Sequence, residues 1–165
     1  MINIITQEFV RELEAERTAT RKCLERMKED LFEYKPHEKS MKMGYLAQVV
    51  AEIPKWISAT VRTGEVNFAT WEKYTVTTVE DLVKFYDANI VLAIEALNAA
   101  TDEDLEGPFV LKAGDQELMK DSKKNSVSSS INHLVHHRGQ LTVYMRLNDI
   151  AVPSIYGPSA DDKTF

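Results

Sequence analysis

Apolar and polar positions follow the period of an amphipathic helix along most of the chain. Apolar residues recur at steps of three and four, and charged residues occupy the remaining faces. This pattern predicts four helices, over residues 4–31, 40–63, 77–98 and 126–148. No convincing set of strands accompanies them, so we predict an all-α fold, a four-helix bundle.

Capping residues indicate where these helices begin and end. Ser40 is expected to cap the second helix, and Gly64 to end it in a left-handed conformation. Thr77 and Glu80 have the spacing of a capping box at the start of the third helix. Pro54 lies inside the second helix and removes one backbone donor, so a kink is expected there.

Residues 66–77, between the second and third helices, have no clear period. They contain the aromatic residues Phe68, Trp71 and Tyr74. We expect this segment to form one longer crossover connection of the bundle. The second and third helices then need not be antiparallel neighbours.

The connection to the fourth helix is of mixed character. Thr101 and Asp104 have capping-box spacing, which predicts a short helical turn. Residues 109–119 contain a Gly-Asp pair and predict a loop or an irregular hairpin. The tail over residues 152–158 is rich in proline and glycine, so we expect it to be non-helical and to pack across the bundle.

Length and charge are those of one globular domain spanning residues 1–165. The chain has 165 residues and a mass of 18.8 kDa, and a typical domain has about 100–200 residues. It carries 20 Lys and Arg against 26 Asp and Glu, a net charge of −6. Because basic residues do not gather on one face, we expect no nucleic-acid partner. The apolar runs fall short of the roughly 20 residues of a membrane span, so we expect no membrane association.

Cysteine content and the N-terminal sequence favour a cytoplasmic protein. The chain has 1 cysteine, so no intrachain disulfide can form. Cys23 lies in the apolar pattern of the first helix, which favours a buried small side chain over a reactive thiol. The first residues lack a basic segment followed by an apolar stretch, so they do not predict a secretory signal.

The residues that most suggest chemistry are three neighbouring histidines, His133, His136 and His137. On a helix, His133 and His137 lie about 40° apart and one turn from each other. Their β-carbons should be about 5–6 Å apart, so both imidazoles could reach one ion at roughly 2.0–2.1 Å. The alternative is one histidine hydrogen-bonded in the core and one at the surface.

Other catalytic patterns are missing from the sequence. No Glu follows His133, so the zinc-protease motif is not present. The chain also lacks a glycine-rich phosphate loop, a Gly-x-Ser-x-Gly motif and a cysteine pair. Ser126 and residues 128–130 precede His133, and their position favours helix-start and packing roles over a nucleophile.

Residues 133–141, with Tyr144 and the tail over 152–159, resemble the fourth helix and tail of DinB-like proteins. Segments 34–41 and 46–54 resemble the same family, in the same order along the chain. This family consists of four-helix bundles and includes thiol-dependent transferases and isomerases. The resemblance implies the same bundle and a divalent metal ion, nickel or zinc, bound by three histidines.

The resemblance assigns two of the three metal ligands to His133 and His137. The third comes from the second helix, at a position where this chain has Val49. A valine cannot bind a metal ion, so the ligand set is incomplete and its affinity is expected to be weaker. The side chains that could substitute for the missing ligand are Glu52, Gln48 and His136.

Two further residues are expected to contribute to binding. Gln140 is placed to hydrogen-bond near the histidines, and Tyr144 to orient a substrate or cofactor. Arg138 lies about 140° around the helix from His133. That position favours a structural ion pair, or a contact with another subunit, over a contact with substrate.

These observations leave two functions open. The first is a divalent-metal-binding protein, a metal-dependent thiol transferase or hydrolase with an incomplete ligand set, acting on a small thiol or an electrophilic small molecule. The alternative is a non-catalytic member of the family that binds a small ligand or acts as a dimeric, stress-related interaction protein. Trp56, Phe68 and Trp71 are large apolar residues that the core need not cover, and they favour a homodimer.

Overall fold

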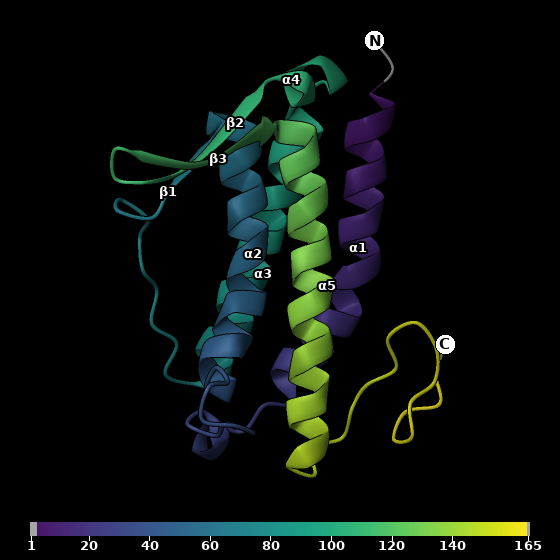
Figure 1. The fold of residues 1–165 in the computed structure, drawn as a ribbon. Coiled ribbons are helices and arrows are strands. Elements are labelled where there is room, and N and C mark those ends of the chain that lie inside the picture. The colour runs from purple at the N-terminus through teal and green to yellow at the C-terminus, as the bar shows by residue number, and fades with distance from the viewer. Residues whose placement is uncertain (1–2, 165) are drawn as a thin grey trace.

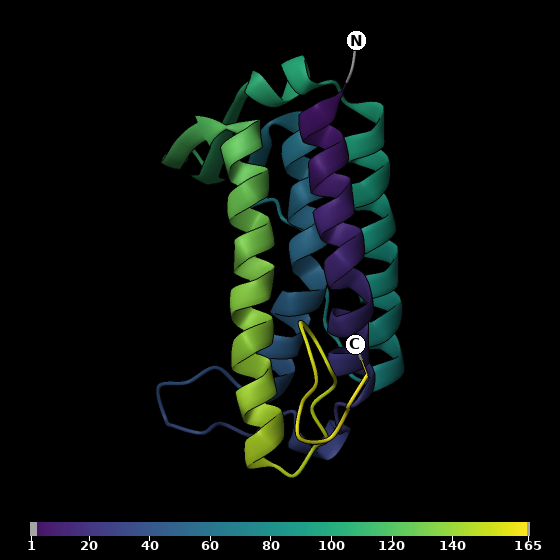
Figure 2. The same ribbon diagram turned by 90° about the vertical axis from the view of Figure 1, so that its right-hand side faces the viewer.

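A computed structural model describes residues 3–164 of the chain. Four long helices dominate it, α1 (Ile4–Glu25), α2 (Met43–Thr63), α3 (Val79–Ala99) and α5 (Lys123–Leu147). Both α1 and α2 pack against α3 and against α5, which closes the bundle (Figure 2). The predicted four-helix bundle is therefore present. No helix among residues 3–164 is both long enough and apolar enough to span a membrane.

The core of the bundle contains the apolar residues that the helical period selects. On α5 the predicted stripe is buried throughout, and it consists of Val127, Ile131, Leu134, Leu141 and Met145. On α1, Leu13 and Leu24 are fully buried. On these two helices the period of three and four identified the inward face, because an apolar side chain is removed from water only on the side of the helix that packs against the bundle.

The segment after α2 is the predicted crossover connection. It runs from the top of the bundle back along the outside to the bottom, so that α3 starts at the same end as α2 and runs parallel to it (Figure 1). The Gln48 side chain holds this segment by donating to the carbonyl of Tyr74 (2.6 Å) and accepting from the amide of Val76 (3.2 Å). The ring of Tyr74 stacks on that of Phe85, with centroids 4.2 Å apart.

The prediction of an all-α fold holds for the bundle but is imprecise, because a small sheet covers one end of it (Figure 1). Its strands are β1 (Glu65–Asn67), β2 (Pro108–Ala113) and β3 (Gln116–Ser122), in the order β1-β2-β3. β1 pairs parallel with β2, and β2 pairs antiparallel with β3. Of the two alternatives for residues 109–119, the irregular hairpin is confirmed, with a break in register after Leu111.

Two of the predicted helix signals are confirmed. Gly64 ends α2 in the left-handed conformation, at φ 69°, and its amide donates to the carbonyl of Thr60 (3.0 Å). Thr101 and Asp104 form a reciprocal capping box at the start of α4 (Asp102–Glu106). Short side-chain and backbone patterns of this kind are decided locally, so the sequence alone predicts them well.

Other helix boundaries were predicted incorrectly. α1 ends at Glu25, and the apolar pattern continues in η1, a short 3-10 helix (Glu29–Leu31) whose Glu29 carboxylate accepts the first amide of α3 (2.9 Å). Lys42, and not Ser40, precedes the first residue of α2. Thr78, and not Thr77, caps α3 by accepting from an amide three residues later (3.1 Å). Ser122 caps α5, which therefore starts before residue 126.

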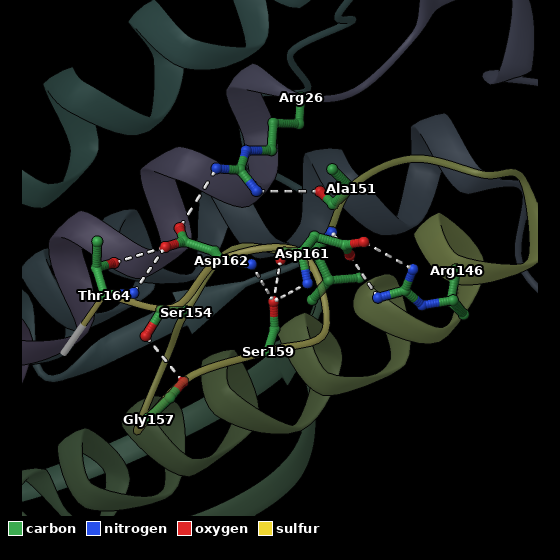
Figure 3. Close-up of polar contacts among 10 residues, drawn as sticks. Arg26, Arg146, Ala151, Ser154, Gly157, Ser159, Asp161, Asp162 and Thr164 are labelled. Carbon is green, nitrogen blue, oxygen red and sulfur yellow. Dashed lines mark hydrogen bonds and ion pairs between the residues drawn. The ribbon is translucent and has the colours of Figure 1, made fainter.

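The C-terminal tail packs across α1 and α5, as predicted (Figure 2). Arg26, just after α1, donates to the carbonyl of Ala151 (3.2 Å) and pairs with Asp162 (3.5 Å) (Figure 3). Arg146, near the end of α5, pairs with Asp161. The hydrogen bond from Arg146 holds the pKa of Asp161 below its usual range. The tail is thus attached to both helices by charged groups.

Candidate functional site

The two predicted metal ligands, His133 and His137, lie side by side on α5. Their ring centroids are 4.4 Å apart, which is the arrangement that a spacing of four residues on a helix produces. His137 is buried and His133 is half-buried. His136 is exposed, with its ring 5.1 Å from that of His137. The histidines therefore form a cluster at the boundary between the bundle interior and its surface.

A hydrogen bond orients His137, and burial affects the pKa of His133. The Oε1 atom of Gln140 lies 2.7 Å from Nδ1 of His137. An amide oxygen can only accept, so Nδ1 of His137 is the donor in this hydrogen bond. Burial, together with the neighbouring His137 and His136, lowers the pKa of His133. The predicted position of Gln140 beside the histidines is confirmed.

One face of α2 forms the opposite wall of this region. Val49, Glu52 and Trp56 recur at steps of three and four and border one cavity of about 420 Å³, which we call the Val49 cavity. The Trp56 ring lies 5.5 Å from the ring of His133, centroid to centroid. The Glu52 carboxylate accepts a hydrogen bond from Nε1 of Trp71 (3.0 Å). The position of the missing ligand, Val49, thus lies on the same face of α2 as Trp56, the residue that contacts His133.

These side chains do not fit a three-ligand metal site. Among residues 3–164, no group of three His, Cys, Asp or Glu side chains is placed to hold a metal ion. Each of the three residues that could replace the missing ligand is either hydrogen-bonded elsewhere or exposed. Glu52 bonds to Trp71, the amide of Gln48 holds the crossover backbone, and His136 is exposed. Val49 itself offers only carbon atoms to an ion.

Tyr144 lies away from the histidine pair. Its hydroxyl donates to the carbonyl of Met41 (3.3 Å), and its ring packs edge-on against Tyr34. Tyr144 is buried two helical turns after His137. The structure therefore brings Gln140 to His137 but holds Tyr144 against the chain before α2, and a contact of Tyr144 with a substrate stays a prediction.

A second cavity lies on the other side of Trp56, beneath the sheet, and we call it the sheet-side cavity. It has a volume of about 320 Å³. Its lining combines the apolar side chains of α2 and the sheet with a polar face of α5; the main contributors are Trp56, Val66, Phe109, Ser126, Ser130 and His133. Sequence reasoning missed this site. The signal was the spacing of Ser126, Ser130 and His133 on one helix face, which we interpreted as helix-start packing.

Arg138 has the structural role that its position on α5 predicts. Its side chain is 1% exposed. It pairs with Glu16 of α1 and donates to the hydroxyls of Thr20 (3.0 Å) and Tyr156 (2.7 Å). The Tyr156 hydroxyl in turn donates to the Glu16 carboxylate (2.8 Å). This network joins α1, α5 and the tail, so Arg138 contributes to the fold and not to the histidine site.

Cys23 is buried in the core, as predicted. Burial raises the pKa of its thiol to about 11, although the positive charges of Arg138 and Arg26 act in the opposite direction. A thiolate is the reactive form of cysteine. Cys23 is therefore a packing residue and no candidate for the nucleophile or ligand of a thiol-dependent reaction.

Comparison with known proteins places this architecture in a family. The model of the DinB family matches residues 1–164, so the chain belongs to the DinB family. A 32-residue segment is 53% identical to the uncharacterized protein YrdA of Bacillus subtilis (strain 168). That segment covers 19% of this chain and 19% of YrdA, so the match spans about a fifth of the relative's length.

Solved structures with the same fold include two DinB-like proteins. YjoA of Bacillus subtilis matches with a TM-score of 0.71 and 22% identity, covering 94% of this chain and 99% of YjoA. A DinB-like protein of Bacillus cereus ATCC 10987 matches with a TM-score of 0.67 and 21% identity, covering 91% of this chain and 97% of that one. At these identities the similarity concerns the fold.

Proposed function

We propose that this chain is a cytoplasmic, small-molecule-binding member of the DinB family that lacks a three-histidine metal centre. The observation that carries this proposal is the surroundings of His133. This residue borders an apolar cavity of about 320 Å³, whereas the position of the expected third ligand is taken by Val49. Cavities of roughly 300–1,000 Å³ with a few polar groups are the usual form of small-molecule sites.

Thermal unfolding in the presence of a chelator tests this proposal. A set of neutral, anionic and cationic small molecules is added, and the melting temperature is compared with that of the protein alone. A ligand at 100 times its Kd stabilises by about 2.7 kcal/mol, which corresponds to a rise of several degrees. We expect at least one class to produce this rise without metal. No rise with any class, but a rise with nickel or zinc once the chelator has been removed, would contradict the proposal.

Two variants of α5 control for effects outside the cavity. Ser130 lines the sheet-side cavity, so Ser130→Phe fills part of it and should remove the rise. Val143 is 56% exposed and lies outside the cavity lining, so Val143→Phe should keep it. A rise that survives Ser130→Phe and is lost in Val143→Phe would place the ligand elsewhere.

The second candidate function is a metal-dependent thiol transferase or hydrolase that acts on a small thiol or an electrophilic small molecule. The neighbouring rings of His133 and His137 favour it, because two imidazoles 4.4 Å apart could share a divalent ion such as nickel or zinc. Two observations argue against this function. The side chain of Val49 has no atom that can bind a metal ion, and the Glu52 carboxylate already accepts a hydrogen bond from Trp71. Stoichiometric metal in the purified protein would support this candidate over the first.

We further propose that the chain forms a homodimer, consistent with a stress-related interaction role. Several large apolar side chains are exposed, among them Tyr45 at 57%, Phe68 at 44% and Val143 at 56%. Exposed apolar groups of this kind are common at surfaces between subunits. Sedimentation at micromolar concentration should give the mass of two chains, and the mass of one chain would contradict a dimer.

A further inference from the structure

The Val49 cavity, between α2 and the crossover connection, has aromatic walls. Tyr45 and Trp56 of α2 and Phe68 and Trp71 of the crossover connection line it. The ring of Trp56 meets those of Trp71 and Phe68 edge-on, with centroids 6.5 Å and 6.4 Å apart. In an edge-on pair only one ring uses its face on the other, so ring faces stay available to a ligand.

This aromatic cluster already holds one positive charge. Aromatic faces attract ammonium groups that lie within about 6 Å of the ring centre, and Nζ of Lys55 lies 5.0 Å from the centroid of the Trp71 ring. Lys55 lies outside the described lining of the cavity, so it does not fill the space. Its charge is also offset by Glu72, 3.3 Å away. A second cation inside the cavity therefore meets no unpaired charge from Lys55.

Two charged residues of opposite sign line the cavity, Glu52 and Lys73. Glu52 is half-buried, and one of its carboxylate oxygens accepts from Nε1 of Trp71 (3.0 Å). A carboxylate has about four lone-pair sites, so this single bond leaves both its charge and most of its accepting capacity. Lys73 is exposed. The lining thus offers a negative group beside the rings and a positive group nearer to solvent.

We propose that the Val49 cavity binds a betaine, a small zwitterion with a methylated ammonium group and a carboxylate. The ammonium group lies among the aromatic rings beside Glu52, and the carboxylate faces Lys73. This inference goes beyond the proposed function, because it concerns the other cavity beside Trp56. It does not depend on a ligand beneath the sheet.

Hydrogen bonding explains why the ammonium group is methylated. A primary ammonium group has three N–H donors, and each donor left without an acceptor on burial costs free energy. In the described lining, Glu52 is the main acceptor, and the aromatic walls offer ring faces instead. A fully methylated ammonium group has no N–H and needs only compensation of its charge, which ring faces and one carboxylate provide. The cavity volume of about 420 Å³ lies in the usual range of small-molecule sites.

Four probes separate the contributions of the two charges. Glycine betaine has both charges, and choline has only the positive one. Ionised tert-butylacetic acid and tert-butylethanol are their carbon analogues, in which a tert-butyl group replaces the trimethylammonium group. Isothermal titration in the presence of chelator measures each Kd. We expect betaine and choline to bind at least about tenfold more tightly than their carbon analogues. Betaine should bind a few-fold more tightly than choline, since a pair with the exposed Lys73 contributes little.

Variants of the two charged residues test their roles. Glu52→Gln keeps an oxygen that accepts from Trp71 but removes the charge, so it should weaken both betaine and choline about tenfold. Lys73→Gln should weaken betaine alone, to the affinity of choline. Glu95→Gln changes an acid of α3 outside the described lining and should alter no Kd. Melting curves confirm that each variant is folded.

Nuclear magnetic resonance tests the contact with the rings. The chain has 2 tryptophans, and both line this cavity. The methyl protons of bound betaine should show nuclear Overhauser effects to the indole rings of Trp56 and Trp71, with the signals assigned from Trp56→Phe and Trp71→Phe. Because this measurement uses the unmodified protein with betaine, it tests the site even if Glu52→Gln does not fold.

The contrary results are equally definite. Carbon analogues that bind as tightly as betaine and choline, or affinities unchanged in Glu52→Gln, would overturn the cation site. Equal affinities of betaine and choline would overturn the zwitterion. No binding of betaine or choline at millimolar concentration, or no contact of betaine with either indole ring, would overturn the whole inference.

Ser130→Phe separates this inference from the proposed function. Ser130 lines the sheet-side cavity and not the described lining of the Val49 cavity, so betaine binding should survive this change. Loss of betaine binding in Ser130→Phe would move the compound beneath the sheet, which overturns this inference and supports the proposed function. Betaine binding that persists while no compound occupies the sheet-side cavity would support this inference and remove the basis of the proposed function.

Discussion

The ring of Trp56 lies against the ring of His133, with their centroids 5.5 Å apart. Trp56 belongs to α2 and His133 to α5, so this contact joins the two helices. Trp56 also borders both the Val49 cavity and the sheet-side cavity. The side chain thus separates the place where a third metal ligand would stand from the apolar space beneath the sheet.

Ser126→Ala is expected to stabilise the free protein. The Ser126 hydroxyl is buried without a partner among the described residues, and removing such a group relieves its desolvation cost. Alanine also has the higher helix propensity. The free energy of unfolding in urea should rise by about 1 kcal/mol. Ser128→Ala, on the same helix but outside the cavity lining, should change it less. A loss of stability in Ser126→Ala would mean that the hydroxyl has a partner in solution.

Val49→His is expected to create a metal site. Val49 shares a helix face with Glu52 and Trp56, and that face contacts His133. A third imidazole there completes the ligand set that the family resemblance implies. Elemental analysis should find about one equivalent of nickel or zinc in Val49→His but not in the control Val49→Leu. If Val49→His remains without metal after incubation with either ion, the valine is not what closes the site.

Arg138→Ala is expected to be strongly destabilising. Arg138 is buried, and its removal leaves the Glu16 carboxylate without its main partner. Breaking a buried ion pair costs about 3–5 kcal/mol, whereas Tyr156→Phe removes only hydrogen bonds and should cost about 1 kcal/mol. Urea denaturation measures both. A cost for Arg138→Ala below that of Tyr156→Phe would contradict the structural role of the arginine.

Asp102 is expected to make stability depend on pH in the acid range. Its carboxylate accepts from the amides of Ile4 (2.8 Å), Ile5 (3.1 Å) and Thr6 (3.0 Å), at the start of α1. Desolvation alone would raise the pKa of Asp102, but the three amide hydrogen bonds outweigh it and the pKa is lowered. The folded pKa lies below the unfolded one, so the stabilisation is present above about pH 3.9 and is lost as pH falls through the folded pKa.

A comparison with Asp102→Asn measures this contribution. The wild type should melt at a higher temperature than Asp102→Asn at pH 7, and the two should converge in strong acid. Glu103→Gln, the neighbouring exposed acid, serves as the control and should show no such convergence. A difference between wild type and Asp102→Asn that persists unchanged in strong acid would rule out the carboxylate as the source.

The parts of the fold that the sequence predicted depend on local patterns. The stripe on α5, the left-handed Gly64 and the capping box at Thr101 are decided by residues a few positions apart. The pairing of β1 with β2 was missed because β1 has three residues and its partner lies far along the chain. The strand β3 is almost wholly exposed, so it lacks the alternation of a half-buried strand.

The candidate site also has parts that local sequence patterns predicted and parts that they did not. Helical spacing alone placed His133, His137 and Gln140 together, since all three lie within two turns of one helix. The sheet-side cavity could not be predicted, because it requires α2, α5 and the sheet to meet. The hydrogen bond from Trp71 to Glu52 likewise depends on where the crossover connection lies. Tertiary contacts of this kind leave no periodic signal in the sequence.

In the proposed function, the histidine pair of this chain is not the core of a resident metal centre. Elemental analysis of untagged protein, purified without chelator, tests it directly beside the double variant His133→Ala/His137→Ala. We expect nickel and zinc far below one equivalent in both proteins. About one equivalent in the parent and none in the double variant would contradict it and would favour the metal-dependent function.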